Sequence, residues 1–159
     1  MRPKPFKPEV WNGDDRYIRD KTSGLVWHRC VYRTLYADTD RSKVVYHANY
    51  LRYFEWGRAS LMHDGGYPYR KIEEDGFIYP IIELGISFFK PLFYDDSMYV
   101  HTRPAQMQRV RIQFDYVITF GETNEIVCKG FTRHCSLNSA GIPVAVDART
   151  VHLWKTFPA

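Results

Sequence analysis

The sequence is poor in cysteine. Its three cysteines, Cys30, Cys128 and Cys135, include no C-x-x-C pair. An odd number of cysteines without that spacing indicates neither a disulfide framework nor a zinc site. We therefore expect free, buried thiols in a reducing compartment, and we predict a cytoplasmic location and no bound metal.

Long apolar segments and a strong excess of one charge are also absent. No stretch approaches the roughly 18 apolar residues that a membrane-spanning helix requires, so we predict no integral membrane segment. The N-terminal stretch MRPKPFKPEVWNGDDR has no apolar core and does not resemble a secretory signal. The net charge is only +4, from 22 Lys and Arg against 18 Asp and Glu. The basic residues are scattered, which predicts no nucleic-acid partner, although the balance suits an anionic ligand.

Aromatic residues, in contrast, are abundant. They make up 16% of the 159 residues and include twelve tyrosines and ten phenylalanines. This length and composition predict one globular domain with a large core, and tyrosine also suits surfaces that face a ligand or another subunit. Pro3, Pro5 and Pro8 set the N-terminus apart. We predict an N-terminal Pro-rich arm over residues 1–24, lying on the surface or left flexible, and the main domain over residues 25–159.

Hydrophobic periodicity predicts an α+β domain. Residues 25–35 are rich in β-branched and aromatic side chains, as in a strand, and residues 49–64 place apolar side chains at helical spacing. We expect Asn49 to cap this helix and Gly65 to end it. About four or five strands follow, the last of them after the turn NSAG. This order predicts an antiparallel sheet of about five to six strands with the long helix laid on it.

The connection between the first strand and the helix carries the most chemistry. It reads YADTDRSKVVYHANYLRYFEWGR and begins at Tyr36. A helix N-terminus offers unpaired N–H groups that can stabilise a developing oxyanion, and a nearby carboxylate completes a site for acyl transfer. The residues also have structural interpretations, because Asp38 and Asp40 can form local turns and His47 can bond to the backbone. Chemistry alone leaves both interpretations open.

This connection resembles the signature of the hot-dog thioesterases. The matching pattern is D-x-D, a short loop, V-V-Y-H-A-N-Y, and then an aromatic residue and a glutamate on the helix. It is most similar to the 4-hydroxybenzoyl-CoA thioesterase group and the Tol–Pal-associated acyl-CoA thioesterases. The resemblance extends more weakly over residues 25–155, including FKPLFYDDSMYV, and leaves residues 1–24 outside.

The resemblance implies a hot-dog fold, in which an antiparallel sheet wraps around one long central helix. It also implies homodimers with active sites at the subunit interface, and association into homotetramers. The implied reaction is hydrolysis of an acyl-CoA or acyl carrier protein thioester. The family uses no metal and no cofactor, since coenzyme A (CoA) takes part only as a portion of the substrate.

The resemblance also implies roles for individual residues. Asp40 matches the catalytic carboxylate, and His47 occupies the position whose backbone N–H holds the thioester carbonyl. Tyr36 matches a further active-site tyrosine. Asn49 and Tyr50 match the motif at the start of the helix and are assigned to substrate binding.

The sequence departs from the family pattern at Ser42 and Lys43, where small residues, often glycine, are usual. Glycine permits backbone conformations that are costly for lysine, so we expect the loop or the acyl preference to differ here. Arg109 and Arg111, on predicted strands, are candidates for binding the CoA phosphates, with solvated surface arginines as the alternative.

Two other functions fit parts of the pattern. A hot-dog hydratase or dehydratase would pair His47 with Glu55, and a non-catalytic acyl-thioester-binding module would suit the aromatic excess. Glu55 also has a structural interpretation, as the partner of Arg58 one turn along the helix.

Overall fold

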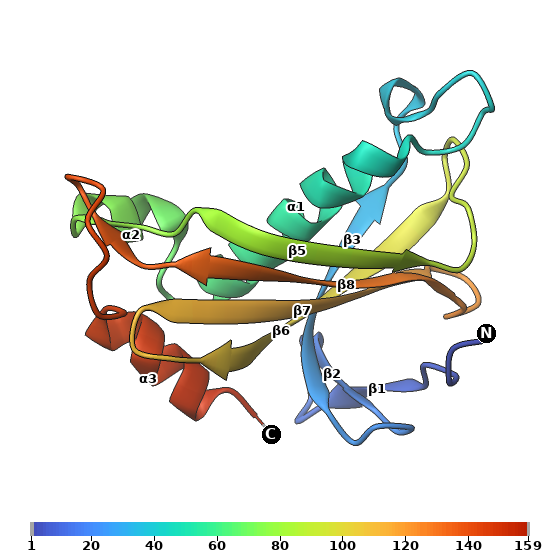
Figure 1. Cartoon of the computed structure of the whole chain (residues 1–159). Coiled ribbons are helices and arrows are strands. Elements are labelled where there is room, and N and C mark those ends of the chain that lie inside the picture. The colour runs from blue at the N-terminus through green and yellow to red at the C-terminus, as the bar shows by residue number, and fades with distance from the viewer. Residues whose placement is uncertain (1, 159) are drawn as a thin grey trace.

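A seven-stranded antiparallel sheet dominates the computed structural model, which describes residues 2–158 (Figure 1). Its strand order is β1-β2-β3-β6-β7-β8-β5, and β4 pairs with β9 in a separate small sheet. The strands are β1 (Pro8–Trp11), β2 (Asp14–Asp20), β3 (Val26–Arg33), β4 (Phe77–Ile78), β5 (Ile81–Phe88), β6 (Ser97–Met107), β7 (Arg111–Phe120), β8 (Ile126–Cys135) and β9 (Leu137–Asn138). The helices are α1 (Tyr50–Asp64), α2 (Tyr69–Glu74) and α3 (Ala148–Thr156), with 3-10 turns η1 (Tyr36–Asp38) and η2 (His47–Asn49).

The long helix α1 lies across one face of the sheet, which confirms the predicted α+β arrangement (Figure 1). Its buried side chains include Tyr53, Phe54 and Leu61, and the Phe54 ring stacks on that of Tyr116 in β7 with centroids 4.2 Å apart. The helix ends at Gly65, as predicted. Asn49 occupies the N-cap position, as predicted, but its side chain makes no capping bond.

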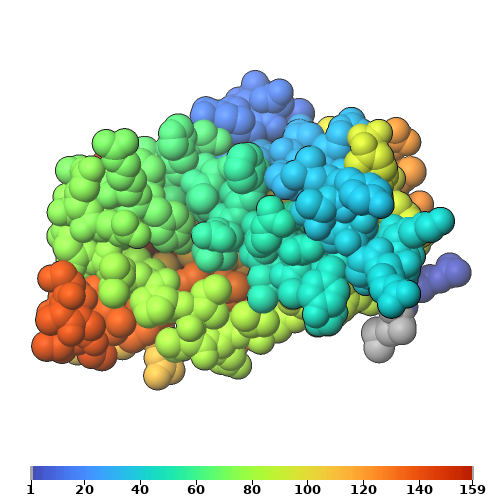
Figure 2. Space-filling view, turned by 90° about the horizontal axis from the view of Figure 1, so that it is seen from above, coloured from blue at the N-terminus to red at the C-terminus, as the bar shows by residue number. Residues whose placement is uncertain are grey.

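The opposite face of α1 is open in the single subunit. Figure 2 shows this helix, in teal, on the surface between the loop that precedes it and α2. Trp56 is 50% exposed, and Glu55 is also exposed. Within residues 2–158 Glu55 forms no ion pair with Arg58, which corrects that expected partnership. The family resemblance implies a helix wrapped by the sheet, and in one subunit the sheet covers only one side of α1.

The sheet has seven strands rather than five to six because residues 8–20 fold into the hairpin β1–β2, which pairs with β3. The hairpin and the arm before it also cover the outer face of the sheet. There Phe6, Ile18 and Trp27 form a second buried cluster with Val117. The N-terminal extension is therefore part of the folded sheet.

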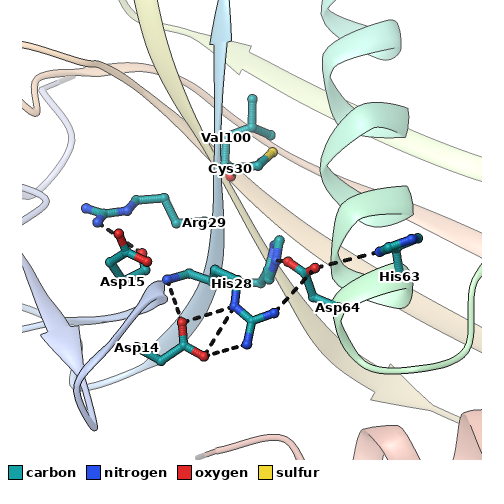
Figure 3. A network of polar contacts seen from close by, with 9 residues as sticks. Asp14, Asp15, His28, Arg29, Cys30, His63, Asp64 and Val100 are labelled. Atoms are coloured by element: carbon teal, nitrogen blue, oxygen red, sulfur yellow. Dashed lines mark hydrogen bonds and ion pairs between the residues drawn. The ribbon is translucent and has the colours of Figure 1, made fainter.

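A polar network fastens this hairpin to the end of α1 (Figure 3). Asp64 is the last residue of α1, and its Oδ2 accepts a hydrogen bond from Nε2 of His28 on β3 at 2.7 Å. Arg16 on β2 reaches the other Asp64 oxygen at 3.6 Å and bonds to Asp14 at 2.8 Å. Burial lowers the pKa of His28, and Asp64 opposes that shift. The network joins the consecutive strands β2 and β3 to the end of α1.

The predicted last strand is wrong, because that region forms α3. Asp147 caps the helix by accepting bonds from Thr150 N at 2.8 Å and Thr150 Oγ1 at 2.7 Å. Thr150 and Leu153 then bury one side of the helix at i, i+3 spacing. Among the described residues, no helix is long and apolar enough to cross a membrane.

Candidate active site

The D-T-D motif leaves β3 and returns toward α1 as a short hairpin-like loop. Thr39 and Val45 face each other in an antiparallel bridge, and Tyr46 N donates to Asp38 O at 2.9 Å. Val45 N in turn donates to Leu92 O at 2.9 Å. These bonds fix the loop against both the helix start and the segment that follows β5.

The two carboxylates of the motif have different surroundings. Asp38 is fully buried and accepts bonds from Leu35 N at 3.0 Å, Arg52 Nη1 at 2.9 Å and Tyr53 Oη at 2.9 Å. Its carbonyl oxygen also accepts from Asn49 Nδ2 at 2.8 Å. Because all these contacts are internal, Asp38 holds the loop to α1 and is not available to a substrate.

Asp40 is exposed at the tip of the same loop. Its carboxylate accepts one bond, from Ser42 N at 2.7 Å, which is a local turn of the expected structural kind. Its backbone N donates to Val44 O at 2.9 Å. Lys43 adopts φ 66°, in the left-handed region that favours glycine, so its backbone has a conformation that glycine permits although it is costly for lysine. Most of the Asp40 carboxylate surface is free to meet a ligand.

The start of the helix provides backbone donors. The turn η2 leads directly into α1, and Asn49 N already donates to Tyr46 O at 2.9 Å. The N–H groups of His47 and Ala48 have no acceptor within residues 2–158. Unpaired N–H groups at a helix N-terminus carry partial positive charge and can bind an anion or an oxyanion.

The predicted aromatic members lie beside this loop. Tyr36 is 78% exposed and meets Tyr94 edge-on, with ring centroids 5.8 Å apart. Tyr50 is buried against Phe88 with centroids 5.0 Å apart, and burial raises its pKa to about 12. Its hydroxyl therefore stays protonated at neutral pH. Tyr36, Asp40, His47, Asn49 and Tyr50 are thus all carried by the same loop and helix start.

The predicted arginines lie elsewhere in the subunit. Arg109 is in the β6–β7 connection and Arg111 begins β7, and both are exposed. Figure 1 shows this connection at the end of the sheet remote from the loop before α1. One subunit therefore does not bring these arginines to Asp40.

The sequence profile of the thioesterase-like superfamily matches residues 34–151, a region that contains this loop, α1 and most of the sheet. The chain belongs to the thioesterase-like superfamily. It is an enzyme of the thioester hydrolase class, with the hot-dog fold of these proteins. The profile begins after β3, so the hairpin β1–β2 lies outside the matched region.

Individual relatives agree with this assignment. A 1,4-dihydroxy-2-naphthoyl-CoA hydrolase of Thermosynechococcus vestitus is 33% identical over 103 residues, which cover 64% of this thioesterase and 70% of that protein. The structure of a hypothetical protein from Aquifex aeolicus has a TM-score of 0.75 at 30% identity and covers 79% of this chain and 98% of that one. A DHNA-CoA thioesterase structure from Staphylococcus aureus has a TM-score of 0.76 at 26% identity, covering 82% and 89%.

Sequence reasoning about this thioesterase missed a buried polar line beneath α1. Tyr116 Oη lies 2.6 Å from Thr132 Oγ1, which lies 2.8 Å from His134 Nε2. His134 Nδ1 donates to Tyr79 O at 2.8 Å, and burial lowers the His134 pKa to about 4. The neutral ring therefore accepts at Nε2, so Thr132 donates to it and Tyr116 donates to Thr132. The alternation of Thr132 and His134 on the inner face of β8 was the available signal.

Proposed function

We propose that this thioesterase hydrolyses acyl-CoA thioesters with Asp40 as the catalytic carboxylate and the His47 N–H as an oxyanion donor. The observation that carries the proposal is that one anchored loop holds both an exposed carboxylate, Asp40, and backbone N–H groups, at His47 and Ala48, that have no acceptor within residues 2–158. Asp38, in contrast, is occupied by internal donors.

In the proposed reaction, the thioester oxygen binds at the start of η2 and the N–H groups stabilise its negative charge. One such donor is worth about 3 to 4 kcal/mol of barrier. Asp40 then attacks the carbonyl carbon, CoA leaves as the thiolate, and water hydrolyses the mixed anhydride. In the alternative route Asp40 takes a proton from the attacking water. Tyr36 and His47 side chains are proposed to orient the carboxylate or the water.

We further propose that the working unit is a homodimer, with tetramers formed from dimers. Edge strand β5 leaves Ile82, Leu84 and Phe88 between 42% and 50% exposed. An unpaired apolar edge favours pairing with another strand. A second subunit joined there would also help to cover the open face of α1 and close a substrate site around Asp40.

Several parts of the substrate assignment are proposals of the same kind. We propose that no metal or other cofactor takes part and that CoA enters as part of the substrate. An acyl carrier protein thioester is the alternative substrate. The 4-hydroxybenzoyl-CoA and Tol–Pal-associated groups remain the proposed subfamilies, while the similar proteins include naphthoyl-CoA hydrolases.

A panel of aliphatic and aromatic acyl-CoA substrates, followed with a thiol reagent, tests the proposed activity. A thioesterase releases free CoA with at least one of them, whereas a hydratase or a binding module releases none. Within residues 2–158, no hydrogen bond joins His47 to Glu55. The two residues that a hydratase or dehydratase would use together are therefore not in contact in this subunit.

Replacing His47 by proline tests the oxyanion donor. His47 is the first residue of η2, where proline fits, and Tyr46 has the extended conformation (φ −62°, ψ 134°) that proline requires before it. His47→Pro removes the N–H and should lower kcat by about 100-fold or more. The matched variant His47→Ala keeps the N–H. Equal kcat in the two variants would contradict a role for this donor.

A further inference from the structure

A cavity of about 670 Å³ lies between the N-terminal arm and the β7–β8 turn. Its walls are residues 2–7 of the arm, Phe89 and Lys90 after β5, and residues 123–126. The arm lies outside the region matched by the superfamily profile. We infer that this cavity binds the phosphorylated adenine nucleotide end of CoA, an inference that rests on the proposed function.

The charge of the cavity suits a polyanion. Arg2, Lys4, Lys7 and Lys90 line it, and Glu125 is the single carboxylate among the lining residues. Lys90 forms an ion pair with Glu125. Arg2, Lys4 and Lys7 form no ion pair with any residue of the described chain 2–158. Three uncompensated cations are thus held around one cavity, and phosphate groups are their natural counterions.

The arm that carries these cations is fixed in place. The Phe6 ring is 7% exposed and packs 6.2 Å from Trp27 and 4.4 Å from His101, measured between ring centroids. Lys7 N donates to Asp20 Oδ1 at 2.9 Å, and Lys21 N donates to Lys7 O at 2.9 Å. Because the backbone at Phe6 and Lys7 is already anchored, binding a ligand there requires little further loss of backbone entropy.

The cavity also offers an apolar surface and a side-chain amide. Phe6, Phe89 and Ile126 contribute apolar atoms against which a base can lie. The Asn124 side chain lines the same cavity. Its amide can donate and accept hydrogen bonds, as recognition of an adenine edge requires. Apolar atoms and an amide beside the cations suit a nucleotide better than a free phosphate.

The cavity lies at the same end of the sheet as the loop that carries Asp40. Phe89 and Lys90 line it, and three residues later Phe93 forms a bridge with Val44. An extended chain advances roughly 3.3 Å per residue, so residues 89–93 span only about 13 Å. The pantetheine arm of CoA can bridge that separation. The β6–β7 connection, which carries Arg109, is at the other end of the subunit (Figure 1).

The first experiment compares the double variant Lys4→Ala/Lys7→Ala with the wild type in thioester hydrolysis. We expect the KM for the acyl-CoA to rise roughly tenfold, as for the loss of about 1.4 kcal/mol of binding, with kcat unchanged. The KM for the acyl-pantetheine thioester, which lacks the nucleotide, should not change. The matched control Arg70→Ala/Lys155→Ala removes the same charge from α2 and α3 and should leave both KM values unchanged. An equal rise for both substrates, or a rise in the control, would overturn the inference.

The second experiment measures binding of adenosine 3′,5′-bisphosphate by calorimetry, without any turnover. Asn124 has φ 59°, which glycine tolerates, so Asn124→Gly removes the amide while keeping the turn. We expect weaker nucleotide binding in Asn124→Gly and in Lys4→Ala/Lys7→Ala, and weaker binding of pyrophosphate only in the latter. If nucleotide binding is weakened by Arg109→Ala and Arg111→Ala and not by Lys4→Ala/Lys7→Ala, the inference is wrong. If the lysine variant weakens nucleotide binding but the wild type hydrolyses no acyl-CoA, the site is supported and the proposed function is rejected. If the wild type hydrolyses acyl-CoA but the lysine variant binds the nucleotide as the wild type does, the proposed function is supported and the site is rejected.

Discussion

Asp38 and Asp40, which are separated only by Thr39, show how two identical side chains come to have different roles. Asp38 is buried among three donors, so its charge is spent on holding the loop. Asp40 makes a single local bond at an exposed tip. Removing the two carboxylates should therefore affect different properties of the protein.

Asp38→Asn should destabilise the fold, because the amide has one acceptor where the carboxylate met three donors. Hydrogen bonds to a buried charge are worth about 1.5 to 3 kcal/mol, and Arg52 is more than half exposed, so we expect a loss of about 2 to 4 kcal/mol. Urea denaturation measures it. Asp40→Asn is the matched control and should change stability by less than about 0.5 kcal/mol. Similar losses in the two variants would contradict the division of roles.

Two buried histidines predict a dependence of stability on pH. Burial lowers the pKa of His134 to about 4 and that of His101 to about 3. In the unfolded chain the histidine pKa is near 6.5, so the unfolded state binds protons more readily than the folded state. The free energy of unfolding is therefore at its full value above about pH 6.5 and falls as the pH drops toward 4. His134 alone accounts for about 3 kcal/mol of this loss.

The pH effect is checked by urea midpoints between pH 7.5 and 4.5. His134→Gln should show a shallower fall than the wild type, whereas the exposed control His152→Gln should follow the wild type. An unchanged slope in His134→Gln would show that the ring is already protonated in the folded state.

Residue-level prediction succeeded where local spacing decided the outcome. The motif from Tyr36 to Tyr50 does form one loop and helix start, as its spacing indicated. The different roles of Asp38 and Asp40 could not be predicted from the sequence. They depend on contacts of Asp38 with Arg52 and Tyr53, which are 14 and 15 residues further along the chain. The hydrogen bonds that connect Tyr116 to His134 depend on the register between β7 and β8. The residue pattern of one strand gives no information about that register.

At the level of elements, the central helix was predictable because its apolar spacing is strong and its glycine end is clear. The hairpin β1–β2 was missed because prolines and a polar turn obscure it, and its stability comes from pairing with β3. The helix α3 was missed because the capping signal of Asp147 was overlooked. Both errors occurred at the chain ends, where tertiary contacts decide the local structure.

At Gly57, α1 lies close against Val100 and Thr102 of β6. A Cβ atom there would lie 2.4 Å from Thr102 Oγ1 and 2.7 Å from Val100 Cγ1. Alanine favours a helix by about 1 kcal/mol over glycine, but overpacking costs about 1 to 3 kcal/mol. Gly57→Ala should therefore destabilise the protein by up to about 2 kcal/mol in urea denaturation. The control Ser60→Ala should cause little loss, and stabilisation by Gly57→Ala would mean that helix and sheet are less tightly packed than described.

For the whole molecule, the single subunit leaves three related features uncovered. These are the loop with Asp40, the outer face of α1 with Trp56, and the apolar edge of β5. In the proposed dimer, one partner subunit covers all three. The proposed dimer thus follows from surface chemistry as well as from the family resemblance.

Leu84→Lys should break this dimer, since it places a charge on the β5 edge that would be buried. We expect light scattering to give the mass of one subunit, with at least tenfold lower kcat/KM for the acyl-CoA. Val31→Lys, on β3 and 64% exposed, is the matched control and should leave mass and activity unchanged. A Leu84→Lys protein that keeps its dimer mass would place the interface elsewhere.

The kcat/KM of Asp40→Asn for an acyl-CoA that the wild type hydrolyses tests the central claim most directly. The account predicts a loss of about 100-fold or more, with unchanged stability and unchanged nucleotide binding, because only the reacting carboxylate is removed. A stable Asp40→Asn enzyme with the kcat/KM of the wild type would contradict it.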